Sequence, residues 1–337
     1  MRIAVENTTW NNIGDGFYQT SIQNLLQSLF PESTVSVFEG PMTRAFKPRY
    51  QWLESKAFDL GALEDADLYV LSGPILTNEF AKDYEHLIKR WREARKPYLI
   101  LSAHGISSAA IDVLRPYPPI AISTRDEITY DALSGVPTER MNGVCFAFFV
   151  SRTIKPCDIV KDAQFITSSF YKSMEPSLMM AGSNGPVEHR LKLGDITLYR
   201  KSGFFHRGAI VKHLVPFKTF PESVGAYKII RVNHDIGMRV PTSHYAYPNS
   251  FFSYNPSGYL SLYKHTACTV TDRVHAAVVT MSYGNPAIYC SSSNRDGLFS
   301  AQGITSRQDG VLRIKPEVLD KQFELASNFI RAAVARI

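Results

Sequence analysis

Hydrophobic and polar positions alternate along the first half of the chain with two different periods. Short apolar runs predict strands at 2–6, 34–38, 67–73, 98–105 and 120–126. Apolar residues spaced three and four apart predict a helix over 17–30, which Pro31 ends, and a helix over 79–95, which stops before Pro97. The polar segment 11–16, NNIGDG, predicts a turn between the first strand and the first helix.

The second half of the chain shows this alternation less clearly. Residues 163–169 predict a strand, whereas 170–225 give no assignable pattern. From 226 onward the pattern predicts a strand, a helix, a strand, a helix, a strand and a long closing helix, in that order, at 226–235, 257–266, 267–271, 272–283, 286–290 and 316–337.

Strands that alternate with helices predict an α/β fold with parallel sheets covered on both faces. The chain of 337 residues is long enough for two domains, and the pattern changes near 150–162. We therefore expect two Rossmann-like parallel-sheet domains that face a cleft, made of residues 1–150 and 151–315, with a closing helix over 316–337. The functional loops of such sheets follow the carboxyl ends of the strands, here 11–16, 72–74, 104–105 and Arg125.

Composition narrows the class of protein. Apolar residues make up 45% of the chain, and no apolar run approaches the length of a membrane span. The N-terminal residues lack the apolar segment of a secretory signal, so we expect a soluble cytoplasmic protein. The cysteines have no metal-ligand spacing and are predicted to be free, buried thiols: Cys145, Cys157, Cys268 and Cys290.

Charge is unevenly distributed between the two halves. Residues 1–150 carry a net charge of −4 and residues 151–337 a net charge of +10. The second half therefore favours an anionic partner, although an excess of solvated surface lysines explains the same balance. The basic residues form no block of the kind that binds nucleic acid, so we expect a small anion and no nucleic acid.

The stretch 271–275, TDRVH, places an acid, a base and an imidazole at the start of the predicted helix 272–283. Asp272 is a good N-cap, because its carboxylate accepts hydrogen bonds from free amides. Arg273 and His275 then fall in the first turn, where the amides and the helix dipole favour an anion and the Arg fork suits phosphate or carboxylate. A structural alternative stays open: an ordinary cap, a surface charge and a core histidine.

Three stretches together resemble the polysaccharide pyruvyl transferase family. TDRVHAAVVTMSYGNPAIYCSSSNRDGLFSAQGI (271–304) is similar to the family's C-terminal signature, D-R-x-H at a helix start followed by G-x-P and an apolar strand. NIGDGFYQTSIQNLL (12–26) resembles its N-x-G-D opening, and ISTRDEITYDALSGV (122–136) resembles its S-x-R-D segment. The matches occur in the family's order and span most of the chain.

The resemblance implies a GT-B-like fold and the transfer of pyruvate from phosphoenolpyruvate, as a ketal, to a sugar of a cell-surface or exopolysaccharide precursor, with release of phosphate. It implies that Arg273 clamps phosphoenolpyruvate and that His275 is the general acid, since histidine titrates near neutral pH. Arg125 matches the family's second arginine and is the next anion contact; a salt bridge with Asp126 or Glu127 is its structural alternative. No step demands a metal or an organic cofactor, so we expect none.

The first loop is where acceptors of GT-B enzymes bind, and the resemblance assigns Asn12, Gly14 and Asp15 to it. In this interpretation Gly14 gives the loop backbone conformational freedom, and Asp15 orients a sugar hydroxyl. The structural alternative is a helix cap with a flexible turn.

Four other side chains and Asp272 complete the candidate binding residues. His104 and His234 both end predicted strands, although a surface histidine is the more common occurrence at such positions. Tyr18 and Trp10 are candidates to stack on a sugar, although aromatic residues more often belong to a core.

Two other functions stay open. A GT-B glycosyltransferase that uses a nucleotide sugar commonly has an acidic residue in its C-terminal domain, and 272–304 offers only Asp272 and Asp296. A non-catalytic sugar- or phosphate-binding homologue is the other alternative. The sequence also leaves open the acceptor sugar, the linkage, whether the acceptor is nucleotide- or lipid-linked, a peripheral contact with a lipid-linked acceptor, and the oligomeric state.

Overall fold

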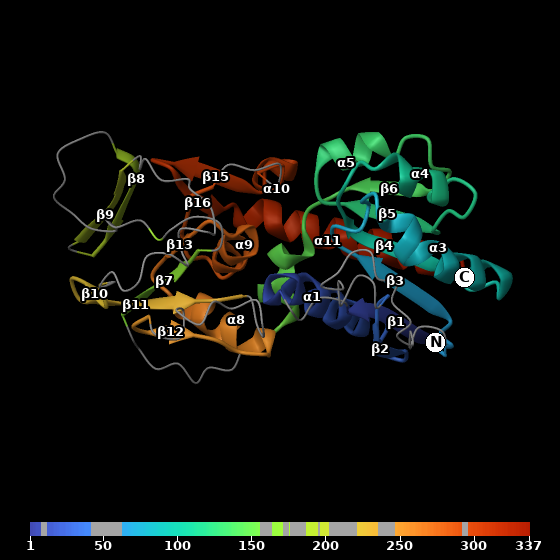
Figure 1. Cartoon of the computed structure of the whole chain (residues 1–337), viewed down its shortest axis with the longest axis horizontal. Helices are drawn as coiled ribbons and strands as arrows, with labels where there is room; N and C mark the ends of the chain where they lie inside the picture. Colours follow the sequence, from blue (N-terminus) through green and yellow to red (C-terminus); the bar gives the residue numbers. More distant parts are fainter. Residues whose placement is uncertain are drawn as a thin grey trace, which may run out of the picture.

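The computed structural model describes residues 1–7, 12–41, 63–155, 164–170, 175, 187–194, 196–201, 221–234, 247–291 and 296–337. Two large sheets with helices packed on them account for most of this part of the chain (Figure 1). No helix among these residues is long and apolar enough to cross a membrane.

The first sheet has six parallel strands. They are β1 (Arg2–Asn7), β2 (Thr34–Glu39), β3 (Leu68–Ser72), β4 (Tyr98–Ala103), β5 (Ala121–Thr124) and β6 (Glu139–Asn142). The order is β2-β1-β3-β4-β5-β6, so the direction in which strands are added reverses between β1 and β3. Five of these strands were predicted from the apolar runs, and their parallel pairing is confirmed.

Helices cover both faces of this sheet. On one face Val5 and Val70 share a core with Phe17 of α1 (Ile13–Leu29). On the other face Leu71 shares a core with Phe80 of α3 (Phe80–Glu93), and α4 (Ser108–Leu114) packs there too. A short helix, α5 (Glu127–Ala132), follows β5.

The start of α1 differs from the prediction, because the segment expected to be a turn already forms the first helical turn. The helix begins at Ile13 instead of at residue 17. Asn12 caps it, since its side chain accepts a hydrogen bond from the backbone N–H of Gly14.

The second sheet is parallel only at its centre. Its strands are β7 (Phe165–Ser169), β10 (Ser223–Val224), β11 (Tyr227–Val232), β12 (Ser250–Phe251), β13 (Thr269–Thr271), β14 (Ala287–Tyr289), β15 (Thr305–Gln308) and β16 (Val311–Ile314). The order is β10-β11-β7-β13-β14-β16-β15, with β12 beside β11. β11 pairs with one side of β7, and β13 pairs with its other side. The direction in which strands are added to this sheet therefore reverses between β7 and β13.

Antiparallel edges correct the prediction of a wholly parallel second sheet. β15 and β16 form a hairpin, in which Asp309 and Gly310 both have positive φ, as a two-residue hairpin turn requires. β10 pairs antiparallel with β11. A separate hairpin of β8 (Val187–Leu193) and β9 (Ile196–Lys201) lies in the region that the sequence pattern left unassigned.

Three helices of the second half follow the prediction closely: α8 (Pro256–His265), α9 (Val274–Ser282) and the closing helix α11 (Pro316–Val334). The short α10 (Gly297–Ser300) was not predicted. α11 returns to the first half, where the Phe149 and Phe323 rings lie 5.3 Å apart and Arg336 forms an ion pair with Glu139 of β6.

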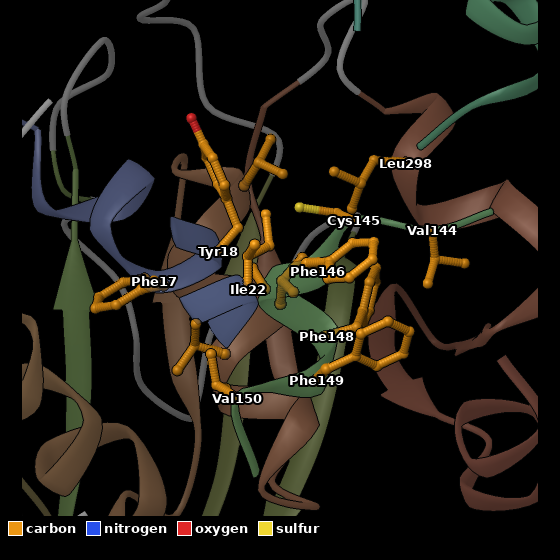
Figure 2. Close-up of a cluster of buried hydrophobic side chains, with 14 of the residues drawn as sticks. Phe17, Tyr18, Ile22, Val144, Cys145, Phe146, Phe148, Phe149, Val150 and Leu298 are labelled. Atoms are coloured by element: carbon orange, nitrogen blue, oxygen red, sulfur yellow. The ribbon is translucent and has the colours of Figure 1, made fainter. Parts of the chain in front are cut away.

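A buried connection joins the two sheets. Residues 144–150 include the single-turn helix η2 (Phe146–Phe149) and the start of α6 (Val150–Thr153), and all seven are at most 2% exposed. Figure 2 shows Phe146 of this connection beside Ile22 of α1, with Cys145, Phe148 and Phe149 close to Phe146. These side chains belong to one apolar cluster with residues of α9, so the two halves share a core.

Candidate functional site

Two helix starts meet where the sheets adjoin. α1 follows β1 at the reversal point of the first sheet, and α9 follows β13 at the reversal point of the second. The backbone N–H of Ile13 donates to the backbone carbonyl of His234 at 3.0 Å. Asp15 Oδ1 lies 3.6 Å from His275 Nδ1. Ligands of open α/β sheets bind at such reversal points, so these contacts define the candidate site.

Gly14 allows the two helix starts to approach this closely. A Cβ at this position would lie 3.1 Å from His275 Nδ1, 3.2 Å from Asn12 Oδ1 and 3.3 Å from His234 Nδ1. Asn12 Nδ2 donates to Asp15 Oδ2 at 3.2 Å and so fixes the carboxylate. The interpretation of Gly14 as a relaxed loop residue is therefore wrong: it lies in a regular helical turn and leaves room for two imidazoles.

His275 lies in the first turn of α9, as predicted, with its side chain 11% exposed. Asp15 faces Nδ1, and Cys145 Sγ lies 3.9 Å from Nε2. The Tyr18 ring packs beside the imidazole, with centroids 5.6 Å apart. A nearby carboxylate favours the protonated imidazole, which is the form that a general acid needs.

The cap of α9 differs from the prediction by one residue. Arg273, not Asp272, is the N-cap, and its side chain makes no capping hydrogen bond. The backbone of Arg273 is extended, and its N–H donates to Thr271 Oγ1 at 2.8 Å. Asp272 is 8% exposed and precedes the helix. The Arg273 side chain is half-buried at the helix start.

Arg125 is a buried cation at the carboxyl end of β5, with only 3% exposure. None of the described residues forms a hydrogen bond or an ion pair with its guanidinium, and its charge acts on the thiol of Cys145. The structural alternative, a salt bridge with Asp126 or Glu127, is not found among the described residues, and Asp126 pairs with His104 instead. Arg125 thus faces the same buried cysteine that His275 contacts.

His234 lies inside the cluster and is 1% exposed, so the expectation of a surface histidine is wrong. Its Nε2 and the Tyr263 hydroxyl are 2.5 Å apart, and its ring packs edge-on against Phe17. Burial lowers the pKa of His234 well below its ordinary value, and the charges of Arg273 and His275 lower it further. His234 is therefore an uncharged, buried side chain that packs against Gly14.

His104 follows β4 and pairs with Asp126, with Nδ1 2.7 Å from Oδ2. Asp126 also caps α5, because its Oδ1 accepts from the Thr129 N–H at 2.9 Å. Burial alone would raise the pKa of Asp126, but the hydrogen bonds from His104 and Thr129 outweigh it and leave the pKa below its ordinary value. Among the described contacts, none joins His104 to Asp15 or His275.

The contacts of two members of the cluster, Cys145 and Tyr18, were not predicted from the sequence. Cys145 was predicted only to be a free buried thiol, which is confirmed for Cys145, Cys268 and Cys290, while Cys157 lies outside the described residues. Tyr18 is fully buried against His275, so it belongs to the core. Trp10 lies outside the described residues. A stripe of apolar residues gives no signal for either contact.

Comparisons with known proteins agree with this arrangement. A sequence model of the polysaccharide pyruvyl transferase family matches residues 12–294. No curated protein matches the chain.

Solved structures give the fold. The S. aureus MnaA–UDP co-structure is similar with a TM-score of 0.50 and 10% identity, over 98% of this chain and 87% of that chain. E. coli ADP-heptose LPS heptosyltransferase II is similar with a TM-score of 0.34 and 11% identity, over 100% of this chain and 99% of that chain. Because the likeness to the MnaA–UDP co-structure extends over nearly the whole chain, the predicted GT-B-like α/β fold is confirmed.

Proposed function

The chain belongs to the polysaccharide pyruvyl transferase family, and we propose that it moves pyruvate from phosphoenolpyruvate to a sugar of a cell-surface or exopolysaccharide precursor as a ketal. Family membership makes it a transferase with a glycan acceptor. The observation that carries the finer proposal is the placement of His275 beside Asp15 at the junction of the sheets, with Arg273 at the same helix start. We place the reaction in the cytoplasm, as the sequence predicts.

Phosphoenolpyruvate carries a phosphate and a carboxylate, and the site supplies cations for both. Arg273 and the free amides of the first turn of α9 form one anion site. The guanidinium of Arg125 forms the second, because a buried cation without a described protein partner is stabilised by an incoming anion.

The proton balance of the reaction matches the groups present. Protonated His275 gives a proton to the methylene carbon of phosphoenolpyruvate, which becomes a methyl group. The first sugar hydroxyl adds to C2, a second hydroxyl then displaces phosphate from C2, and the ketal closes. Of the two hydroxyl protons, one restores His275 and the other leaves with phosphate. The step as written uses no metal and no organic cofactor.

The acceptor side of the site belongs to α1. Asp15 faces Nδ1 of His275 at 3.6 Å, and one of its oxygens is held by Asn12. In this position the carboxylate can accept the proton of an incoming sugar hydroxyl while it supports the imidazolium. His234 lies against Gly14 where the two helix starts meet, whereas no described contact joins the pair of His104 and Asp126 to Asp15 or His275.

Two measurements test the proposal. Calorimetry should detect phosphoenolpyruvate binding to the whole chain, and phosphate release should follow with a sugar from a panel of free, nucleotide-linked and lipid-linked acceptors. Binding of nucleotide sugars without binding of phosphoenolpyruvate would identify a glycosyltransferase instead. Binding of phosphoenolpyruvate with no phosphate release for any acceptor would identify a non-catalytic homologue.

The variant His275→Asn separates the catalytic role from a structural one. Asparagine fills much of the same volume at the second helical position but cannot deliver a proton. We expect binding of phosphoenolpyruvate to persist and kcat to fall by ~10²–10⁴-fold. Joint loss of melting temperature, phosphoenolpyruvate affinity and turnover would show that His275 is a core residue.

A further inference from the structure

A buried thiol contacts the imidazole of His275 on the side opposite Asp15. Cys145 is fully buried, and its Sγ lies 3.9 Å from Nε2. Figure 2 shows Cys145 at the edge of the apolar cluster near Tyr18, whose ring also packs on His275. A thiol is a weak hydrogen-bond donor and a weak acceptor, so either the sulfur or Nε2 could carry the shared proton.

The chemistry of the two groups decides the direction of this contact. A thiol sulfur is a weak acceptor, whereas the unprotonated nitrogen of a neutral imidazole accepts readily. The S–H of Cys145 is therefore the donor and His275 Nε2 the acceptor. Burial raises the pKa of the Cys145 thiol, although the nearby Arg125 charge opposes the shift, so the proton stays on sulfur at neutral pH.

Ser102 holds the backbone next to Cys145 at the cost of backbone strain. It has φ +57°, is fully buried, and lies where the pairing of β4 with β5 shifts register. Its N–H donates to Ser123 Oγ at 3.0 Å, and its hydroxyl accepts from the Phe146 N–H at 3.4 Å. A left-handed, non-glycine residue in a strand costs of order 1–3 kcal/mol and is retained where the surroundings require it. This conformation places the hydroxyl against the N–H of Phe146, the residue that follows Cys145.

We propose that Cys145 is a positioning residue for His275, whose S–H donates to Nε2 so that the neutral ring carries its proton on Nδ1, the nitrogen that faces Asp15. The 3.6 Å separation between Nδ1 and Asp15 leaves that nitrogen accessible to a reactant, whereas Nε2 is engaged. Protonation at Nε2 has to displace the thiol proton. Cys145 therefore opposes Asp15: a donor at Nε2 favours the neutral ring, whereas the carboxylate favours the protonated ring.

The inference rests on the proposed role of His275, but its test does not need an acceptor sugar. Among the described residues, the titratable and charged groups near the imidazole include Asp15 and Tyr18 from α1, Cys145 from the buried connection, His234 after β11 and Arg273 from its own helix start. All except Cys145 are unchanged in the variants below.

The experiment is nitrogen NMR of the full chain labelled with ¹⁵N-histidine, recorded across a pH titration. His275 is identified as the signal that His275→Asn removes. The wild type should show a neutral His275 ring protonated at Nδ1. Cys145→Ser should keep this tautomer, because a hydroxyl donates in the same direction. Cys145→Ala should give a mixture of both tautomers and raise the pH midpoint of His275 by roughly half a pH unit, the size that one weak hydrogen bond supports.

Cys268→Ala is the matched control, because Cys268 is also fully buried but belongs to the separate core cluster of the second sheet. It should leave the tautomer and the midpoint of His275 unchanged. A wild-type ring protonated at Nε2, or a Cys145→Ala spectrum identical to that of Cys268→Ala, would overturn the inference. Failure of the pyruvyl transfer proposal would appear instead as absent phosphoenolpyruvate binding with these spectra unaffected.

Discussion

Asp15 on α1 and His275 on α9 face each other across the junction of the two sheets, with the carboxylate oxygen 3.6 Å from Nδ1. The two residues lie near opposite ends of the sequence. Each is at the start of a helix that follows a strand next to a reversal point. The pair is an acid and a base held by separate halves of the molecule, so its geometry depends on how the halves pack.

Asp15→Asn should lower the turnover number by at least about tenfold, since general acid catalysis as a whole is worth ~10²–10⁴-fold. Without the carboxylate the protonated imidazole is less favoured, so the fall of activity with rising pH should begin at lower pH than in the wild type. Phosphate release measured across pH checks both effects. An unchanged pH profile would show that Asp15 does not act on His275.

Arg273→Lys should weaken phosphoenolpyruvate binding although it keeps the charge. Lysine is a point charge and cannot hold two anionic oxygens as a planar fork. Loss of one buried charged contact typically costs about 2–5 kcal/mol. Calorimetry with phosphoenolpyruvate gives the affinity, and equal affinities for the two proteins would assign Arg273 a structural role only.

Arg125→Met should separate stability from binding. Arg125 is 3% exposed, and its guanidinium has no hydrogen bond or ion pair with the described residues, so its burial costs free energy in the unliganded protein. We expect the variant to melt at a higher temperature, by an amount equivalent to about 1–3 kcal/mol, and to lose phosphoenolpyruvate affinity. A lower melting temperature with unchanged affinity would contradict the assignment of Arg125 to the anion site.

Gly14→Ala should impair the site more than the fold. Alanine favours a helix over glycine by about 1 kcal/mol, which offsets part of the crowding. The new Cβ would lie 3.1 Å from His275 Nδ1, so the imidazole must move. We expect a small change in melting temperature and a clear loss of turnover. Gly297→Ala in α10 is the control, because a Cβ there meets no atom within 4 Å, and both quantities should be preserved.

His234 should make the fold sensitive to mild acid. Its folded-state pKa lies well below the unfolded value of about 6.5, so the unfolded chain binds the proton more readily. Its contribution to stability is therefore present above about pH 6.5 and is lost as pH falls from there toward the folded-state pKa. His234→Gln retains an amide near Tyr263 and cannot titrate. Its melting temperature should fall less between pH 7.5 and 5.5 than that of the wild type, and parallel curves would exclude this source of acid sensitivity.

Local sequence patterns determined most of the elements. The apolar runs that became β1, β3 and β4, and the amphipathic stripe of α3, depend on residues close together in the chain. The helix start after β13 was likewise visible in TDRVH, to within one residue of the cap. The edge hairpin of β15 and β16 was missed, although Asp309-Gly310 is a local turn signal that could have found it.

Contacts between distant segments were decided by the tertiary structure. Nothing near Gly14 in the sequence shows that two imidazoles lie against it, and Cys145 reads as an ordinary buried thiol. Both facts depend on strand order and on the buried connection 144–150, which sets how the two sheets meet. Periodicity records which face of an element is buried. Periodicity does not predict which residues from distant segments become buried against one another. That is decided when the whole chain packs, because two helix starts can approach closely only if the side chains of both fit together.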